Sequence, residues 1–311
     1  DALKGSILSG LLRIRSLGYI TILERRSEVF GFSFFLILSM LVPFTLARSG
    51  ELNDPFSISN QNPFVNIFGL PKHRSSQVLT VGVSESKIGY SVSSNYEFDV
   101  NELGDQIFLD GESEIWTFSY RRGVGNNWEA GLILPLIKHS GGYLDRTIIQ
   151  WHDWFGMPQG GRDEGLIDEL NYRVDIGGAN RFMLSERVQR AGDVVLLVGK
   201  SFRSNINLRS ELKIPTGNPK HLLGSGGLDF GLSFSYQRYL SADWIWGGMI
   251  ALSYLSGSET GLINDDFILA ASSHLLFRVK PRLALKLQWD LNRSPYSSIS
   301  LDPFSKLGGV L

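Results

Sequence analysis

Alternating side chains predict that this 311-residue chain is an all-β protein, an antiparallel up-and-down transmembrane β-barrel of about twelve strands. Polar and apolar residues alternate in repeated runs, whose length matches the roughly 9–11 residues that a tilted strand needs to cross a bilayer. Aromatic residues stand at the ends of an apolar face between Trp244 and Tyr254, where a bilayer interface favours amphipathic rings. A stretch with the layout of a secretory signal precedes these runs.

The N-terminal region predicts an upstream segment and signal peptide over residues 1–47, followed by a single barrel domain over residues 48–311. Two arginines precede an apolar run that Pro43 interrupts, and small residues then suit cleavage after Ala47. A transmembrane anchor is the alternative, although Pro43 suits a cleavage region better than a spanning helix.

Composition excludes several other classes of protein. Hydrophobic residues make up 43% of the chain and charged residues 20%, so it resembles neither a disordered protein nor a helical membrane protein. Thirty basic and 31 acidic side chains leave a net charge of -1, which gives no electrostatic argument for a nucleic-acid partner. The absence of cysteine removes disulfides, thiolate metal sites and cysteine nucleophiles.

Period-two alternation locates the individual strands, and helical spacing of apolar residues predicts one helix over residues 143–155. Asp110-Gly111 is expected to form a turn, and residues 170–176 a short strand outside the membrane. The membrane strands are expected at residues 64–70, 77–84, 87–100, 113–121, 128–136, 193–202, 204–214, 228–237, 244–254, 267–279, 283–291 and 308–311.

Connection lengths favour an outer-membrane barrel, which alternates short periplasmic turns with long outer loops. The short connections are 203–204, 238–243 and 279–282, and the long ones are 215–227, 255–266 and 292–306. A soluble sandwich or secreted barrel, whose apolar face would form a core, produces the same alternation and stays open as an alternative. In a bilayer the sheet must close into a barrel, because lipid cannot form hydrogen bonds with an open sheet edge. The apolar face then contacts lipid, and the polar face lines the enclosed interior.

Two groups of residues are candidate sites. Five charged residues on the polar faces of two strands are expected in the lumen, where they either pair across the interior or form a polar wall for a solute; they are Arg209, Glu211, Lys213, Lys286 and Asp290. A binding cluster is expected in the long connection 137–192, either as a substrate lid or as a loop held together by an Asp–Arg pair and buried aromatics. Its residues are Asp145, Arg146, Trp151, His152, Asp153 and Arg162.

No catalytic residue, metal ligand or cofactor site is predicted from the motifs. The five histidines lack metal-ligand spacing, and Gly217-Asn218-Pro219-Lys220 lacks the ending of a phosphate-binding loop. A barrel enzyme would use His152 or His274, although a lumen hydrogen bond is the simpler account of His274.

Several segments resemble an uncharacterised family of Gram-negative outer-membrane proteins, domain of unknown function 3187. They are Tyr120-Arg121-Arg122-Gly123, Leu134-Pro135, Gly141-Gly142-Tyr143-Leu144-Asp145-Arg146 and, most specifically, residues 151–162. The resemblance implies an outer-membrane barrel without an established activity, so it transfers no functional residue. Outer-membrane strands usually finish on an aromatic residue, whereas this chain ends Val310-Leu311, so its last strand is expected to be truncated.

The function predicted from these features is a passive channel or transporter for a small solute in the cell outer membrane, gated by the connection 137–192. The expected partners are outer-membrane lipid, a small solute and the barrel-assembly machinery, with no nucleic acid. The alternatives are a barrel enzyme such as a lipid hydrolase and a plugged barrel that displays its outer loops.

Overall fold

The computed structural model describes residues 53–203, 205–281, 283–305 and 308–310. The predicted signal peptide therefore lies outside the described residues. The chain divides into two compact units, which in the described part are a small helical unit over residues 146–165 and a barrel unit that contains the rest.

Thirteen strands in the described part of the chain form one sheet in the barrel unit. They are β1 (Ser84–Val100), β2 (Gln106–Gly125), β3 (Trp128–Ser140), β4 (Asn171–Ile176), β5 (Ala179–Leu184), β6 (Val188–Ala191), β7 (Val194–Arg203), β8 (Ile206–Ile214), β9 (Asp229–Tyr239), β10 (Trp244–Leu255), β11 (Phe267–Lys280), β12 (Leu283–Asn292) and β13 (Gly308–Val310). Short helices α2 (Pro63–Asn66), η3 (Pro219–His221) and α4 (Asp302–Ser305) accompany the sheet.

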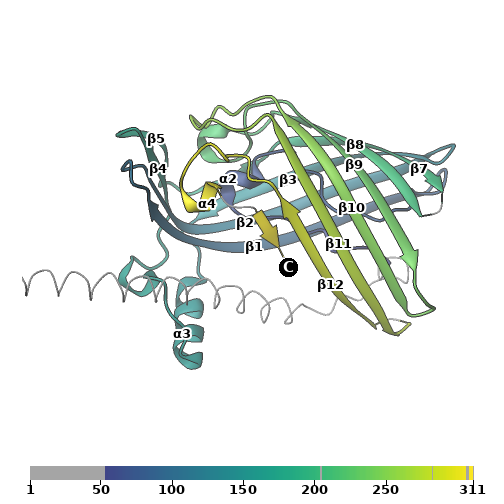
Figure 1. Ribbon diagram of the computed structural model, residues 1–311, viewed down its shortest axis with the longest axis horizontal. Coiled ribbons are helices and arrows are strands. Elements are labelled where there is room, and N and C mark those ends of the chain that lie inside the picture. Colours follow the sequence, from purple (N-terminus) through teal and green to yellow (C-terminus); the bar gives the residue numbers. More distant parts are fainter. Residues whose placement is uncertain (1–52, 204, 282, 306–307, 311) are drawn as a thin grey trace, which may run out of the picture. The chain divides into compact units, whose positions relative to one another are not determined.

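The named strands pair antiparallel, and the sheet of the barrel unit curls into a half-barrel (Figure 1). β1, β2 and β3 are neighbours in chain order, and β7 to β13 follow in order beside β3. β4, β5 and β6 are inserted between β3 and β7 and extend the sheet beside β2 and β3. The predicted fold class, an antiparallel up-and-down β-barrel with a short helix in a long connection, is confirmed at the level of this half-barrel.

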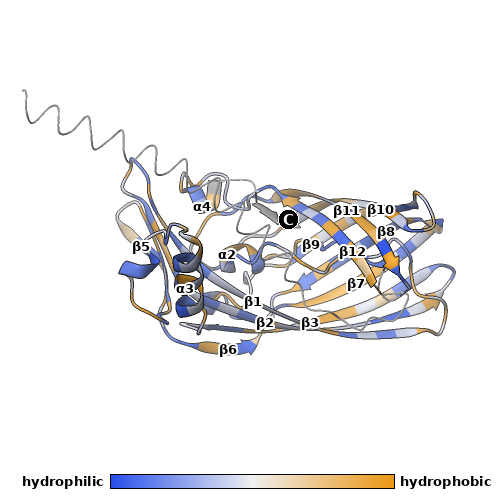
Figure 2. Cartoon of the chain, turned by 90° about the horizontal axis from the view of Figure 1, so that it is seen from below, coloured by the Kyte–Doolittle hydropathy of each residue, from blue (hydrophilic) through white to orange (hydrophobic). Residues whose placement is uncertain are grey.

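Hydrophilic and hydrophobic residues alternate along the strands (Figure 2), and the exposure of their side chains assigns them to opposite faces of the sheet, as the alternation predicts. On β9, Phe230, Leu232 and Phe234 are exposed on the outer face, while Asp229 and Ser233 are buried on the inner face. The same arrangement recurs on β10, where Trp, Ile, Leu and Tyr side chains alternate outward from Trp244 to Tyr254. The apolar face therefore points outward, and the soluble alternative with an apolar face buried between layers does not describe this sheet.

An apolar cluster, which we call the apolar cap, fills one end of the half-barrel around α2. Phe64 is fully buried there and makes edge-to-face contacts with Phe182 of β5 at 5.1 Å and with Phe304 of α4 at 5.4 Å between ring centroids. Ile107 and Tyr172 are also fully buried in the same cluster. The cap is a conventional hydrophobic core inside a sheet whose remaining interior is mainly polar.

The structure corrects three local predictions. Residues 64–70 do not form a strand, because Pro63 starts helix α2 and the Asn62 side chain caps it by accepting a hydrogen bond from the Phe64 amide at 2.9 Å. Residues 77–83 precede β1 as coil apart from a single bridge at Val81. Asp110-Gly111 lies within β2, where its neighbour changes from β4 to β3.

Gly111 is required at that change of partner. Its φ of 147° lies in a region that other residues rarely adopt. A Cβ at this position would lie only 2.7 Å from Cδ1 of Leu170. Glycine therefore lets β2 bend and continue where the sequence indicated a turn.

The helical unit contains most of α3 (Asp145–Phe155) and the short helix η2 (Arg162–Glu164), so the expected helix is present. Trp151 and Phe155 stack with ring centroids 4.4 Å apart. The Gln159 amide donates hydrogen bonds to the Asp153 carboxylate at 2.7 Å and to the carbonyl of Ile149 at 3.1 Å, which ties the chain after the helix back to it. No helix in the described part of the chain is both long and apolar enough to span a membrane.

Candidate functional site: a polar interior threaded by the N-terminal segment

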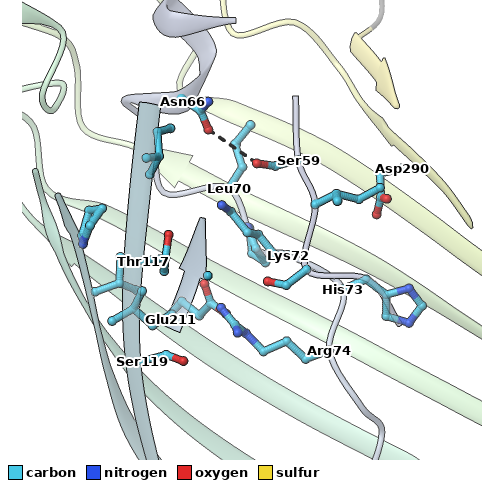
Figure 3. Close-up of a pocket in the computed structure, with 18 of the residues that line it drawn as sticks. Ser59, Asn66, Leu70, Lys72, His73, Arg74, Thr117, Ser119, Glu211 and Asp290 are labelled. Atoms are coloured by element: carbon cyan, nitrogen blue, oxygen red, sulfur yellow. Dashed lines mark hydrogen bonds and ion pairs between the residues drawn. The ribbon is translucent and has the colours of Figure 1, made fainter. Parts of the chain in front are cut away.

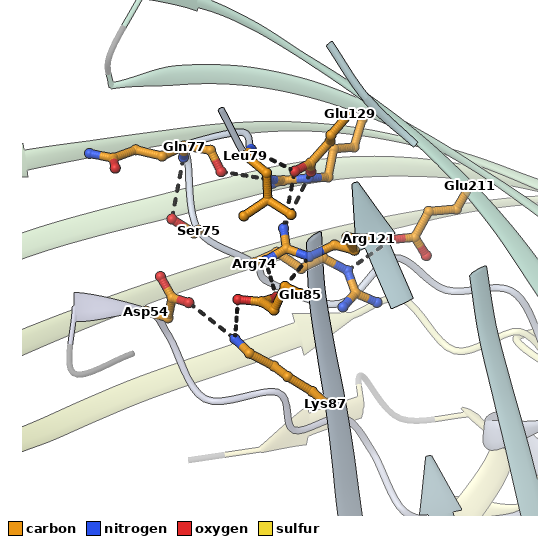
Figure 4. A network of polar contacts seen from close by, with 11 residues as sticks. Asp54, Arg74, Ser75, Gln77, Leu79, Glu85, Lys87, Arg121, Glu129 and Glu211 are labelled. Atoms are coloured by element: carbon orange, nitrogen blue, oxygen red, sulfur yellow. Dashed lines mark hydrogen bonds and ion pairs between the residues drawn. The ribbon is translucent and has the colours of Figure 1, made fainter. Parts of the chain in front are cut away.

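Residues 53–83, which we call the inner segment, contact inward-facing side chains of strands from both halves of the sheet. Glu129 of β3 joins several of these contacts (Figure 4). It is fully buried, and it accepts hydrogen bonds from Arg209 Nε at 2.9 Å, Arg121 Nη1 at 3.3 Å and the Leu79 amide at 3.2 Å. Arg209 Nη2 also donates to the carbonyl of Gln77 at 3.3 Å. One carboxylate thus links β2, β3 and β8 to the inner segment.

A second ionic group surrounds Lys213 of β8. Its ammonium lies 2.5 Å from the Asp193 carboxylate and 3.2 Å from the Asp229 carboxylate, and all three side chains are buried. Asp229 also accepts a hydrogen bond from the amide of Gly69 at 2.8 Å, and Ser253 donates to the Gly69 carbonyl at 3.3 Å. A Cβ on residue 69 would lie 3.0 Å from Cβ of Asp229, so glycine allows this close approach.

The next residues of the inner segment make side-chain contacts with β8 and β11. Arg74 forms an ion pair with Glu211 at 3.3 Å. His73 Nδ1 lies 2.8 Å from the Ser272 hydroxyl, and its ring centroid lies 4.8 Å from that of His274. Burial, followed by the neighbouring His274 and the Arg209 charge, lowers the pKa of His73 to about 3, so this imidazole is neutral at physiological pH.

The start of the inner segment contacts both β1 and β12. The Asp54 carboxylate lies 3.3 Å from the Lys87 ammonium of β1, and its carbonyl accepts a hydrogen bond from Lys286 of β12 at 2.7 Å. The Gln288 side chain on β12 bonds both backbone groups of Phe56, at 2.7 Å to its amide and 3.0 Å to its carbonyl. These contacts hold the inner segment between β1 and β12.

A cavity of about 460 Å³ lies between the inner segment and the strands (Figure 3). This volume is within the range of about 300–1,000 Å³ that is typical of ligand pockets. Lys72, Arg74 and Glu211 contribute charges to its lining, whereas Ile115 and Ile133 contribute apolar surface. The cavity can therefore hold a small molecule that has both a charged and an apolar part.

The five charged residues expected in the lumen all lie on the inward phase of their strands. Arg209, Glu211 and Lys213 are buried and pair with residues that the sequence did not single out, as described above. On β12, Lys286 contacts the inner segment, and Asp290 accepts a hydrogen bond from Gln288 at 2.7 Å. Their placement is a structural observation, and a role for them in solute passage stays a proposal.

The loop cluster is split between the two units. Asp145 belongs to the barrel unit, where it is buried and accepts a hydrogen bond from the Asp168 amide at 2.9 Å. The other five residues belong to the helical unit; they are Arg146, Trp151, His152, Asp153 and Arg162. Within that unit, Asp153 stabilises the turn after α3 through Gln159, and a binding role for the cluster remains a prediction.

A serine–histidine contact that resembles part of a hydrolase site lies elsewhere, between Ser113 and His139. The Ser113 hydroxyl is 2.9 Å from His139 Nδ1, but His139 Nε2 faces the carbonyl of Leu222 at 3.2 Å, and both side chains are buried. A triad would place a carboxylate at that second nitrogen. Among the described residues, no cluster of three or more His, Asp or Glu side chains could hold a metal ion.

The sequence-based interpretation missed the inner segment and the carboxylates that hold it. Residues 53–76 carry no strand or helix periodicity that would reveal their contacts, because a coil that follows the inside of a sheet needs none. Glu129 and Asp229 could have been found, since each is an acidic residue on the polar phase of an otherwise apolar strand. Asp193 lies at the start of β7 and carries no such signal.

Comparison with known proteins gives a family and two structures of related shape. No curated protein sequence matches the chain. An outer membrane channel from Pseudomonas putida F1 is similar at 12% identity and a TM-score of 0.43, over 70% of this chain and 74% of that one. BamA from Haemophilus ducreyi lacking POTRA domains 1–3 is similar at 11% identity and a TM-score of 0.27, over 73% of this chain and 54% of that one. The family model described as "Protein of unknown function (DUF3187)" matches residues 35–307, and the chain belongs to that family.

Proposed function

We propose that the protein is an outer-membrane β-barrel that passes a small solute through its interior, with the inner segment as the gate. The observation that carries this proposal is the polarity of the sheet, whose polar side chains face inward and whose apolar side chains face outward. Arg209 and Lys213 are buried inside, while Phe230, Phe234 and Ile250 are exposed outside. Exposure of such an outer face to water would cost free energy. Contact with lipid avoids this cost, and the polar groups form their hydrogen bonds and ion pairs inside the barrel.

The contacts of the inner segment support a gating role. Between residues 69 and 79 it is held by hydrogen bonds and ion pairs to strand side chains and has no strand neighbours of its own. Water can replace each of these bonds when the segment moves, because hydrated and paired polar groups differ by only about 0.5–1.5 kcal/mol per hydrogen bond. The connection 137–192, the gate expected from the sequence, contributes β4, β5 and β6 and remains a second place where passage could be controlled.

A disulfide that fixes the inner segment to β9 tests this gate. A Cβ on residue 231 would lie 2.6 Å from Cγ of Pro71, so cysteines at both positions are close enough to be linked. The protein has no cysteine of its own, so Pro71→Cys/Gly231→Cys contains a single pair. We expect small-solute flux into proteoliposomes to be low when the pair is oxidised and to recover after reduction.

The matched controls are the two single-cysteine variants, whose flux should not respond to reductant. Folding of each variant is checked by its heat-modifiable migration on gels. A correctly inserted wild-type protein that passes neither ions nor small solutes contradicts the proposal, as does flux that is equal in the oxidised and reduced double variant.

A plugged barrel that displays its outer loops is the second candidate function, and one observation favours it. The inner segment is held on both sides of residues 69–77, by Phe64 in the apolar cap and by the hydrogen bond from Leu79 to Glu129. A permanently closed interior predicts no flux in either redox state. Lipid and the barrel-assembly machinery are the partners that either function requires.

A further inference from the structure

Lys72 differs from the other charged groups that line the cavity, because no hydrogen bond or ion pair engages its ammonium among the described residues. Arg74 is paired with Glu211, and Lys213 is paired with Asp193. Lys72 is half-buried on the inner segment, and its side chain points into the cavity toward the side walled by β2 (Figure 3). Partial removal of an ammonium from water without a counter-charge costs free energy, so the site favours an anion.

The remaining charged groups around the cavity are satisfied by one another. Arg121 pairs with Glu85, which also lies 3.3 Å from the Lys87 ammonium, and Lys87 reaches Asp54. Asp290 accepts a hydrogen bond from Gln288. The neutral His73 ring contacts Ser272. Lys72 is therefore the one cavity cation, among the residues described, that is available to a ligand.

The cavity also has an apolar wall. It is formed by inward-facing side chains of three neighbouring strands and by one residue of the inner segment, namely Ile115, Ile133, Ile137, Val195 and Leu70. Desolvating an apolar group against this wall contributes about 25 cal/mol per Å² of buried apolar surface. A multiply charged or fully polar anion would gain nothing there.

We propose that the cavity binds a small monocarboxylate with an apolar body. Its carboxylate pairs with Lys72, and its apolar body packs on the apolar wall. This inference rests on the proposed transport function and names the class of its solute. A carboxylate is matched to a single ammonium by charge, and a volume of about 460 Å³ limits the apolar part to the size of a phenylalkyl group or a short acyl chain.

Binding of 4-phenylbutyrate to the detergent-folded protein, measured by calorimetry, tests the site. 4-Phenylbutanol has the same body without the charge and controls for partition into the micelle. We expect the alcohol to bind roughly tenfold more weakly or worse, and Lys72→Met to lose a similar factor for the acid. Lys220→Met, in the connection between β8 and β9, is the matched control and should bind like the wild type.

The pH dependence separates an ion pair from a general effect on folding. Burial, followed by the charge of Arg74, lowers the pKa of Lys72 to about 8, while Glu211 opposes this. The ammonium is present at pH 7 and is lost as the pH rises through its pKa, so affinity for 4-phenylbutyrate should fall between pH 7 and pH 10. Lys72→Arg keeps its charge over this range and should retain binding at pH 10.

Three results overturn the inference: no binding of 4-phenylbutyrate, equal binding of the acid and the alcohol, or equal binding to the wild type and Lys72→Met. The disulfide experiment reports on passage independently of this ligand. Redox-dependent flux without Lys72-dependent binding rejects the solute class alone, whereas Lys72-dependent binding without flux rejects the transport function.

Discussion

Two parts of the inner segment, α2 and residues 69–79, are held in different ways. Around α2, Phe64 packs into a fully buried apolar cap with Phe182 and Phe304. From Gly69 to Leu79, the same segment is held by single hydrogen bonds and ion pairs to the polar wall. Apolar packing must be dismantled as a unit, whereas polar contacts can be exchanged one by one for water. The difference indicates a fixed anchor at the cap and a movable part between residues 69 and 79.

Removal of the Glu129 carboxylate should have the largest effect on the part of the inner segment that polar contacts hold, residues 69–79. Glu129→Ala leaves the Arg121 and Arg209 guanidinium groups buried without their shared partner, so we expect the free energy of unfolding to fall by about 3–5 kcal/mol. Urea titration in lipid vesicles measures this, with the exposed Glu102→Ala as control. A loss equal to that of the control would show that the Glu129 contacts do not hold the interior.

Phe64→Ala tests the part of the inner segment around α2 that packs in the apolar cap. The cavity left in the cap should cost up to about 3–5 kcal/mol, somewhat less where neighbouring side chains collapse into it. Hydrogen exchange should increase at α2 while the amide of Leu79, bonded to Glu129, stays protected. Equal loss of protection along the whole inner segment would mean that the two parts form a single cooperative unit.

A charge on the outer face of the sheet should lower the stability of the whole protein, without a selective effect on α2 or on residues 69–79 of the inner segment. Ile250 is exposed near the middle of β10, and Ile250→Lys should destabilise the lipid-embedded protein by about 2–4 kcal/mol. Ile263→Lys, at an exposed position in the connection after β10, is the control and should be nearly neutral. If both substitutions had the same small effect, the outer face of β10 would not be in contact with lipid.

Arg74→Ala should have the smallest effect, because Arg74 is less buried than the groups that Glu129 pairs with and makes a single ion pair among the described residues, with Glu211. We expect a loss of about 1–2 kcal/mol and faster hydrogen exchange between residues 70 and 77, with α2 unchanged. The same substitution should raise solute flux if this stretch is the gate. Unchanged exchange at residues 70–77 would exclude the Arg74 pair from holding it.

Much of the sheet could be predicted from the sequence, because each long strand presents one face to the exterior and one to the interior of the half-barrel. Apolar and polar residues therefore alternate regularly from β8 to β12. Leu208 and Arg209 are one example, and Leu232 and Ser233 are another. Short turns between these strands were also predictable. The faces, the helix α3 and the inward position of Arg209 follow from the pattern alone.

The inner segment could not be predicted in the same way, since its structure depends on contacts far apart in sequence. The Gly69 amide bonds Asp229, and Phe56 bonds Gln288. Only the start of α2 carried a local signal, in Asn62-Pro63, and a strand was expected there instead. The available charge of Lys72 is likewise visible only when the partners of every other cavity residue are known.

A single-cysteine scan of β10 tests the central claim, that the apolar face of this sheet meets lipid and the polar face is enclosed. The native chain has no cysteine, so each position from Ile245 to Tyr254 can carry one spin label in lipid vesicles. We expect oxygen to reach labels at Trp246, Ile250 and Tyr254 and a water-soluble nickel chelate to be excluded from them, with a period of two along the strand. Accessibility to the chelate at these outer positions equal to that at Ile263 would contradict the membrane assignment and, with it, the proposed transport.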